Sequence, residues 1–164
     1  MPTTAGGVKY DLSAARYMKT YLIINNQALP VIGGQKGEKL EATPNGDVVT
    51  TQETFEGAAM HFISNSKAGN ITINTVPGSH VNNLIQWLFD QMLKADLKTV
   101  DPTFGVRSEN ELTGRIITGN GCLITGQPTE QENDGAWTLP WKITCSEYTV
   151  TRPTPDEIAM LQTQ

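Results

Sequence analysis

The alternation of apolar and polar residues along the chain predicts a mainly β protein. The clearest strand is predicted over residues 136–150, where apolar side chains occupy every second position. These apolar positions are Trp137, Leu139, Trp141, Ile143 and Cys145. One face of this strand is expected to be buried and the other wet, and Pro140 favours a position at a sheet margin.

Shorter strands are predicted in the first half of the chain. Residues 20–24 and 28–32 flank Asn25 and Asn26, a pair that tolerates the positive φ angles of a tight hairpin turn. Residues 38–43 are expected to form a polar strand in a projecting hairpin, because glycines precede them and a turn sequence follows. Strands are also predicted at 48–51, 57–64 and 70–76, with the last two paired as a hairpin. Apolar residues on both faces of 57–64 predict burial on both faces.

The second half contains one helix and further β segments. Ser79 is a preferred N-cap, and the helix predicted at 79–95 carries an apolar stripe with steps of three and four residues. The stripe consists of Val81, Leu84, Ile85, Leu88, Met92 and Ala95. Trp87, Phe89 and Leu93 lie off the stripe, which indicates a second contact. Residues 96–111 are predicted to be irregular, and glycines at 114–126 predict bends or bulges in two β segments.

The chain divides into three parts. Residues 1–18 show no sustained period and are interpreted as an N-terminal arm that orders on a partner. Residues 19–150 form the β domain, and 151–164 form a C-terminal extension. Within the extension, Thr154 precedes Pro155 and Glu157 at the spacing of an N-cap, a first-turn proline and a capping box, which predicts a short helix.

Composition limits the possible partners. A chain of 164 residues suits one domain, which buries about 70% of its unfolded surface. Charged residues make up only 18%, a proportion that favours burial against neighbouring subunits, and the net charge is −5. This acidic balance argues against tight binding of nucleic acid phosphates. No run approaches the ~18 apolar residues of a membrane helix, and the N-terminus lacks the pattern of a secretory signal, so synthesis in the cytoplasm is expected.

Candidate catalytic and ligand-binding residues have simpler structural explanations. His61 and His80 have no partners at metal-ligand spacing, and Cys122 and Cys145 are expected to be buried, reduced strand residues, with a disulfide left open. The acidic residues in two turn-like segments favour a solvated surface over a glycosidase dyad. They are Glu109, Glu111, Glu130, Glu132 and Asp134. The glycine-rich segments lack phosphate-loop and dinucleotide-binding spacing. We therefore expect no enzyme, no cofactor and no metal.

The order of the segments resembles the tail-tube protein of contractile-tailed bacteriophages. The resemblance covers roughly residues 10–150, and its most specific block is SKAGNITI at 66–73, followed by Ser79 and by Asn83-Leu84 in the helix. Supporting parts are Tyr10-Asp11, the LIINNQALP strand pair, the GGQKGEKLE projection and Glu56-Gly57. Tube proteins of type VI secretion are related to the same family.

The resemblance implies an antiparallel β-sandwich or barrel with one packed helix. It also implies hexameric rings that stack into a hollow tube for DNA ejection inside a contractile sheath. The implied partners are further copies of the chain, the sheath protein, baseplate or initiator proteins and the tape-measure protein. Genomic DNA would pass through the lumen without specific binding, and no membrane is involved. The protein would belong to the virion tail and assemble in the host cytoplasm.

Two sets of contact residues follow from the resemblance. The projecting hairpin carries Lys36, Glu38, Lys39 and Glu41, whose alternating charges are expected to contact the adjacent ring. The outer helix is expected to face the sheath with Trp87, Asp90 and Lys94. The alternatives are another tube protein, such as one of type VI secretion, and a stand-alone β-barrel module that binds a ligand at Trp87 or on the Trp137 face. A third alternative is a hydrolase that uses the carboxylates at 109–134 as its acid and base.

Overall fold

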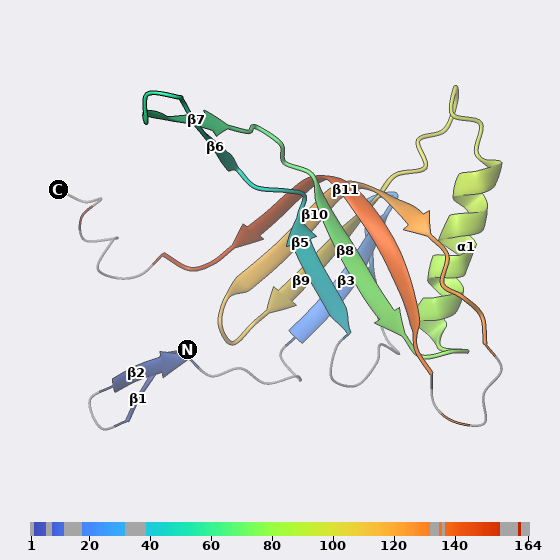
Figure 1. Cartoon of the computed structure of the whole chain (residues 1–164). Coiled ribbons are helices and arrows are strands. Elements are labelled where there is room, and N and C mark those ends of the chain that lie inside the picture. The colour runs from blue at the N-terminus through green and yellow to red at the C-terminus, as the bar shows by residue number, and fades with distance from the viewer. Residues whose placement is uncertain are drawn as a thin grey trace.

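A seven-stranded antiparallel sheet with one helix packed on it forms the body of the protein (Figure 1). The computed structural model describes residues 2–5, 8–11, 18–31, 39–131, 135, 137–154 and 161. The strand order is β4-β3-β9-β10-β11-β8-β5. Two further antiparallel pairs, β1-β2 and β6-β7, form sheets of their own. This architecture confirms the predicted mainly β fold with one packed helix.

The first edge of the sheet contains a predicted hairpin and a strand that was not predicted. β3 (Met18–Ile24) turns into β4 (Gln27–Pro30) through Asn25 and Asn26, which have φ angles of 51° and 64°. This confirms the hairpin. The next strand, β9 (Phe104–Asn110), lies in the stretch predicted to be irregular, so that prediction was wrong. Its buried positions end with Ser108 and Asn110, whose polarity hides the alternation.

The two longest strands occupy the middle of the sheet. β10 (Arg115–Gly126) is continuous, although its register with β9 shifts between Gly119 and Cys122. Gly121 has a φ of 61° at this bulge, a conformation that glycine adopts without steric cost. The bulge confirms the irregularity predicted from the glycines, but the two predicted β segments are one strand, so that part of the prediction was wrong. β11 (Leu139–Thr151) buries the alternating apolar residues of its first half, as predicted. Pro140 lies beyond the end of β10, whose pairing reaches only Lys142, so the proline adjoins β8 alone.

The second edge of the sheet differs from the prediction. β8 (Gly69–Thr75) pairs with β11 and with β5 (Leu40–Pro44), and not with residues 57–64. The predicted hairpin of 57–64 with 70–76 was therefore wrong. β5 is an edge strand of the main sheet, so its residues do not belong to a projecting hairpin. The element that projects is instead the hairpin of β6 (Val49–Glu53) and β7 (Ala59–Ile63) (Figure 1).

The helix α1 (His80–Lys94) covers one face of the sheet. Its N-cap is Ser79, whose Oγ accepts a hydrogen bond of 3.3 Å from the backbone N–H of Asn82. The predicted stripe faces the core, where Val81, Ile85 and Leu88 are buried. Phe89, which lies off that stripe, also reaches the core, with its ring centroid 6.1 Å from that of Trp141.

A polar anchor fixes the helix on the sheet. Asn82 Oδ1 accepts hydrogen bonds from Trp141 Nε1 at 2.9 Å and from Thr75 Oγ1 at 3.2 Å. Trp141 and Thr75 are both buried, and an unsatisfied donor at such a position costs about 1–3 kcal/mol. The first turn of α1 is therefore tied to the start of β11 and the end of β8.

The terminal segments are described in part. β1 (Pro2–Ala5) and β2 (Val8–Asp11) form an antiparallel pair within residues 1–18, where the sequence pattern predicted no strand. Of the predicted C-terminal helix, Leu161 is helical and its other residues from 155 on lie outside the described part of the chain. The prediction of that helix is therefore not tested.

Candidate assembly surfaces

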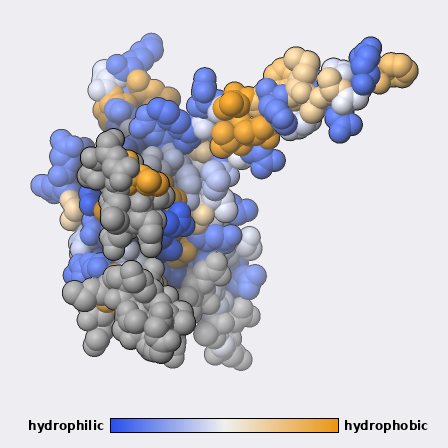
Figure 2. Space-filling view, turned by 90° about the vertical axis from the view of Figure 1, so that its left-hand side faces the viewer, coloured by the Kyte–Doolittle hydropathy of each residue, from blue (hydrophilic) through white to orange (hydrophobic). Residues whose placement is uncertain are grey.

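The β6–β7 hairpin is an apolar arm that stands away from the sheet. Every residue of β6 and β7 is exposed, and Phe55 in the connecting turn is 101% exposed. Figure 2 shows apolar side chains gathered along this projecting arm. Its large exposed apolar residues are Val48, Val49, Phe55, Met60, Phe62 and Ile63. A group of large apolar side chains exposed on one projecting element typically marks an interaction site.

The arm keeps its shape through polar contacts of its own. Thr54 closes the turn, because its Oγ1 accepts from Ala58 N at 3.1 Å and its backbone N–H donates to the carbonyl of Ala58 at 2.7 Å. Across the two strands, Thr51 Oγ1 and His61 Nδ1 are 2.8 Å apart. The apolar residues of 57–64, predicted to be buried on both faces of their strand, are exposed in the single chain. The prediction that they are buried within the chain was therefore wrong. An isolated hairpin is marginal in water, so burial of these side chains requires another surface.

The main sheet ends in two short strands. β4 is paired with β3 and β5 is paired with β8, which leaves the outer side of each strand without a partner strand in the described part of the chain. Unpaired main-chain groups at a sheet edge can pair with another chain. Each edge strand ends with a proline, Pro30 or Pro44, which lacks a donor and limits indiscriminate pairing.

The part of the sheet formed by β5, β8 and β11 is polar on the face opposite the helix. Glu41, Thr72 and Lys142 are neighbours in register across β5, β8 and β11. The adjacent row contains Asn70 and Thr144, whose Oγ1 donates to Asn70 Oδ1 at 3.2 Å. This face therefore combines threonine and asparagine side chains with charges of both signs.

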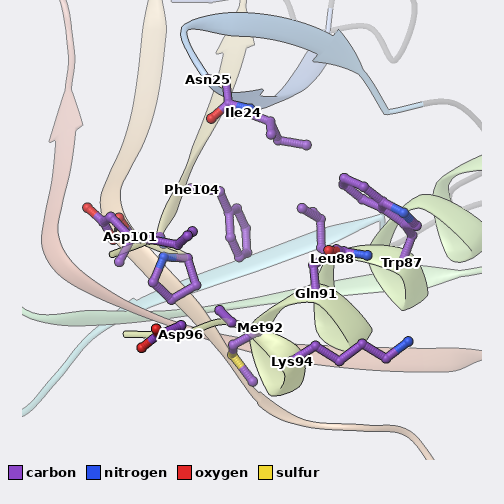
Figure 3. A pocket seen from close by; sticks show the side chains of 14 residues that line it. Ile24, Asn25, Trp87, Leu88, Gln91, Met92, Lys94, Asp96, Asp101 and Phe104 are labelled. Carbon is purple, nitrogen blue, oxygen red and sulfur yellow. Dashed lines mark hydrogen bonds between the residues drawn. The ribbon is translucent and has the colours of Figure 1, made fainter. Parts of the chain in front are cut away.

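The outer side of α1 forms one wall of an open cleft, shown in Figure 3. The cleft has a volume of about 380 Å³ and lies between the helix, the end of β3 and the start of β9. Trp87 and Lys94 both line it, and Trp87 is 52% exposed. Asp90 is half-buried, and its Oδ1 accepts from Gln86 Nε2 at 3.2 Å. Two of the three residues predicted to face the sheath therefore share one surface.

Lys39 and Glu41, two of the four residues predicted for ring contacts, lie next to or on the edge strand β5 and not in a projecting hairpin. Lys36 and Glu38 lie outside the described residues. Lys39 is half-buried next to β5, where its carbonyl accepts from Asn74 N at 2.9 Å and burial lowers the pKa of its ammonium group. Glu41 is exposed on the edge strand β5. The sequence carried a signal for the β6–β7 arm in its two apolar faces, but that signal was interpreted as internal burial.

Two of the acidic residues considered for catalysis, Glu109 and Glu111, take part in ion pairs at the surface. Arg107 Nε is 2.5 Å from Glu109 Oε1, and Lys19 Nζ is 2.9 Å from Glu111 Oε1. Glu132 and Asp134 lie outside the described residues. Among the residues that the structure describes, no group of three or more His, Cys, Asp or Glu side chains is placed to hold a metal ion. No helix in that same part of the chain is long and apolar enough to span a membrane.

Trp141 and the two cysteines have the structural positions predicted for them, whereas Trp137 lies outside the strand in which it was predicted. Trp141 is 1% exposed, so its face belongs to the core and is not a platform for a carbohydrate. Trp137 is partly buried just before β11. Cys122 and Cys145 are free, buried and located on the neighbouring strands β10 and β11. Both side chains belong to the main hydrophobic core.

Comparison with known proteins identifies the architecture. No protein-family model and no curated protein matches the sequence. Among solved structures, a chain of the PVC sheath/tube terminator from an extracellular contractile injection system aligns with a TM-score of 0.54 and 13% identity, covering 88% of this chain and 99% of that one.

Two further structures align over similar shares. A chain of the PVC sheath-tube complex aligns with a TM-score of 0.51 and 14% identity, covering 87% of this chain and 93% of that one. A chain of the anti-feeding prophage baseplate, solved with 6-fold symmetrisation, aligns with a TM-score of 0.55 and 13% identity, covering 87% and 97%. The chain therefore shares its fold with chains of these contractile particles, which is consistent with the tail-tube-like fold that the sequence resemblance implied.

Proposed function

We propose that this protein is the structural subunit of a phage tail tube. Copies close into hexameric rings, and the rings stack into a hollow conduit for DNA ejection inside a contractile sheath. The subunit acts by assembly and not as an enzyme. Its partners are further copies of itself, the sheath protein, a baseplate or initiator complex and the tape-measure protein. Assembly takes place in the host cytoplasm, and the product is part of the virion tail.

The observation that carries the proposal is the exposed β6–β7 arm beside a sheet with two unpaired edges. A single copy leaves the apolar side chains of the arm in water and, among the residues that the structure describes, provides no partner strand for the outer main-chain groups of β4 and β5. Closure into a ring removes sheet edges, and a neighbouring subunit supplies the surface that the arm lacks. Similarity to chains of a sheath-tube complex and of a baseplate solved with 6-fold symmetry supports this arrangement.

The two faces of the sheet suit different surroundings in such a tube. The polar face with Thr72, Asn70 and Lys142 lines the lumen, where side chains without a strong basic field allow DNA to pass without specific binding. The opposite face carries α1, which lies outside and presents Trp87, Asp90 and Lys94 to the sheath. The net charge of −5 agrees with a conduit that does not retain nucleic acid.

Charged residues near β5 supply contacts between successive rings. We assign Lys36, Glu38, Lys39 and Glu41 to this role, with Glu41 exposed on the edge strand. An exposed ion pair contributes about 0–1 kcal/mol, but a symmetric ring repeats each contact around its circumference. Weak pairs therefore add up to a cooperative ring-to-ring interface.

Electron microscopy of the purified protein tests the proposal. Supplied with its baseplate or initiator complex, the protein is expected to form rings with a central hole and then tubes. Rings that never stack would instead assign the protein as a tube terminator, a second candidate that the similarity to the PVC terminator supports. Monomers that stay folded and never form rings at any concentration would refute both.

A further inference from the structure

Cys122 and Cys145 form a sulfur pair in the centre of the sheet. They are directly opposite each other in the register of β10 and β11, and their Sγ atoms are 2.7 Å apart. Both residues are fully buried. Each is a free cysteine, so the pair is a dithiol in this state.

The backbone already has the geometry that a bond between these sulfurs requires. Residues directly opposite in an antiparallel pair have Cα atoms about 4.5–5.5 Å apart. Disulfides span about 4.4–6.8 Å between Cα atoms, so either type of cross-strand pair lies within that range. The two strands therefore need no rearrangement to be bridged.

Gly119 leaves the space that the two sulfurs occupy. A Cβ atom at this glycine would lie 2.6 Å from Cys145 Sγ and 3.2 Å from Cys122 Sγ. Glycine is therefore the residue that fits beside the pair without displacing a sulfur. The next residues, up to Gly121 with its positive φ, form the bulge that brings Gly119 and Cys122 onto the same side of β10.

The contact between the sulfurs separates their acidities. One thiol donates to the other sulfur, and this hydrogen bond, together with burial, raises the pKa of Cys122. The same hydrogen bond lowers the pKa of Cys145, although burial opposes this change. A thiolate is the reactive form towards oxidants, and either sulfur can be the donor of the hydrogen bond, so oxidation begins at whichever of the two thiols loses its proton.

We propose that Cys122 and Cys145 are a redox site, oxidised by a peroxide to an intramolecular disulfide that cross-links β10 to β11. One of the two thiols loses its proton and the resulting thiolate attacks one peroxide oxygen. The O–O bond breaks, the departing hydroxide takes up the proton that the thiol released, and a sulfenic acid and one water form. The other sulfur then attacks the sulfur of the sulfenic acid, the S–O bond breaks, and a second water leaves with the remaining thiol proton. The two sulfurs lose two electrons and hydrogen peroxide gains them.

Burial determines how this site responds. Because both sulfurs are buried in an apolar core, a small uncharged oxidant reaches them only when the sheet opens locally. The neighbouring thiol then captures the sulfenic acid before further oxidation. The disulfide closes the loop between residues 122 and 145 and joins the two longest strands, so the oxidised subunit resists unfolding more than the dithiol does.

Peptide mapping of the full-length protein tests the proposal. The reduced protein is treated with hydrogen peroxide, quenched with catalase, denatured and alkylated with N-ethylmaleimide. The expected intact mass lacks two hydrogens and carries no maleimide, and dithiothreitol restores two alkylated thiols. Trypsin separates the cysteines by cutting after Arg115 and Lys142, so the disulfide joins fragment 116–142 to fragment 143–164.

Three results would overturn the proposal. In the first, both thiols remain alkylatable although methionines of the same protein have been oxidised. In the second, sulfinic acid forms at either cysteine. In the third, disulfide-linked dimers form in place of the intramolecular disulfide. Cys122→Ala and Cys145→Ala serve as matched controls, since each leaves one thiol without a partner and no monomeric product that lacks two hydrogens should form. Oxidation of the wild type is expected to raise the midpoint of thermal unfolding by roughly 5–10 °C relative to the reduced protein. Equal midpoints would contradict the stabilising role.

Discussion

Phe55 is the residue whose substitution best separates assembly from folding. It lies at the tip of the β6–β7 arm and is 101% exposed, so its side chain contributes no packing to the single chain. Substitution by serine is therefore expected to leave the stability of the monomer within about 0.5 kcal/mol of the wild type. In the proposed tube, the same side chain is buried against a neighbouring subunit.

The magnitude follows from the burial of one aromatic side chain. Complete burial of phenylalanine contributes about 1.5–3 kcal/mol, and in the proposed tube every added subunit would bury one Phe55. A loss of about 2 kcal/mol for each subunit corresponds to a change of roughly 30-fold in an equilibrium constant, because 1.4 kcal/mol is tenfold. Phe55→Ser is therefore expected to raise the critical concentration for tube formation by roughly 30-fold.

Sedimentation and electron microscopy over a concentration series measure this value. Leu97→Ser is the matched control, because Leu97 is also large, apolar and 74% exposed but lies in the loop after α1 on the outer side of the proposed tube. The control is expected to assemble like the wild type. A Phe55→Ser protein that forms tubes at the wild-type critical concentration would show that the arm tip is not buried in the assembly, and the argument from its exposure would fail.

Two other predictions concern the helix anchor and the ring contact. Asn82→Ala leaves Trp141 Nε1 without its acceptor and is expected to cost about 2 kcal/mol, measured as a drop of roughly 4–8 °C in the unfolding midpoint. Asn82→Asp keeps an acceptor near the start of the helix, and a loss equal to that of alanine would contradict the assigned hydrogen bond. Reversal of Lys36 and Lys39 to glutamate is expected to shorten the tubes without unfolding the subunit, as judged by micrographs and circular dichroism. Tubes of wild-type length would refute the ring-contact assignment.

Local sequence signals predicted the elements that depend on local physics. Ser79 began the helix where its side chain caps the first turn, and Asn25 and Asn26 marked a turn that requires positive φ. The alternating residues of β11 showed which face is buried. In each case the residue type responds to its own backbone or to its own side of the strand, so a short window contains the necessary information.

Pairings between distant strands were not predictable in this way. β8 was assigned to the strand just before it in sequence, but it lies between β11 and β5 because these strands complete the buried face around Ile71 and Ile73. β9 was missed because Ser108 and Asn110 are buried polar residues, and Thr20 Oγ1 donates to Ser108 Oγ at 3.4 Å across the sheet. A buried hydrogen bond to a remote strand leaves no hydrophobic signal in the sequence.

The sequence pattern of the exposed β7 strand was recognised, but it was interpreted as packing within the chain and not as contact with another subunit. A strand with apolar residues on both faces, such as β7, requires cover on both faces, and the pattern cannot tell whether the cover comes from the same chain. In the fold, α1 covers one face of the main sheet, and the arm remains outside this core. The same pattern therefore changes from a prediction of core packing into an argument for a partner.

The two kinds of exposed surface depend on each other. β4 and β5 contain only four and five residues, and each includes a proline, so edge pairing alone supplies few main-chain hydrogen bonds to a neighbour. The arm alone supplies apolar area but is a single two-stranded hairpin without a core. A subunit that binds through both the β6–β7 arm and an edge strand binds stably only to a neighbour that contacts these two surfaces at the same time. Because this requirement fixes the relative orientation of two copies, it favours a repeated, closed arrangement over random aggregation.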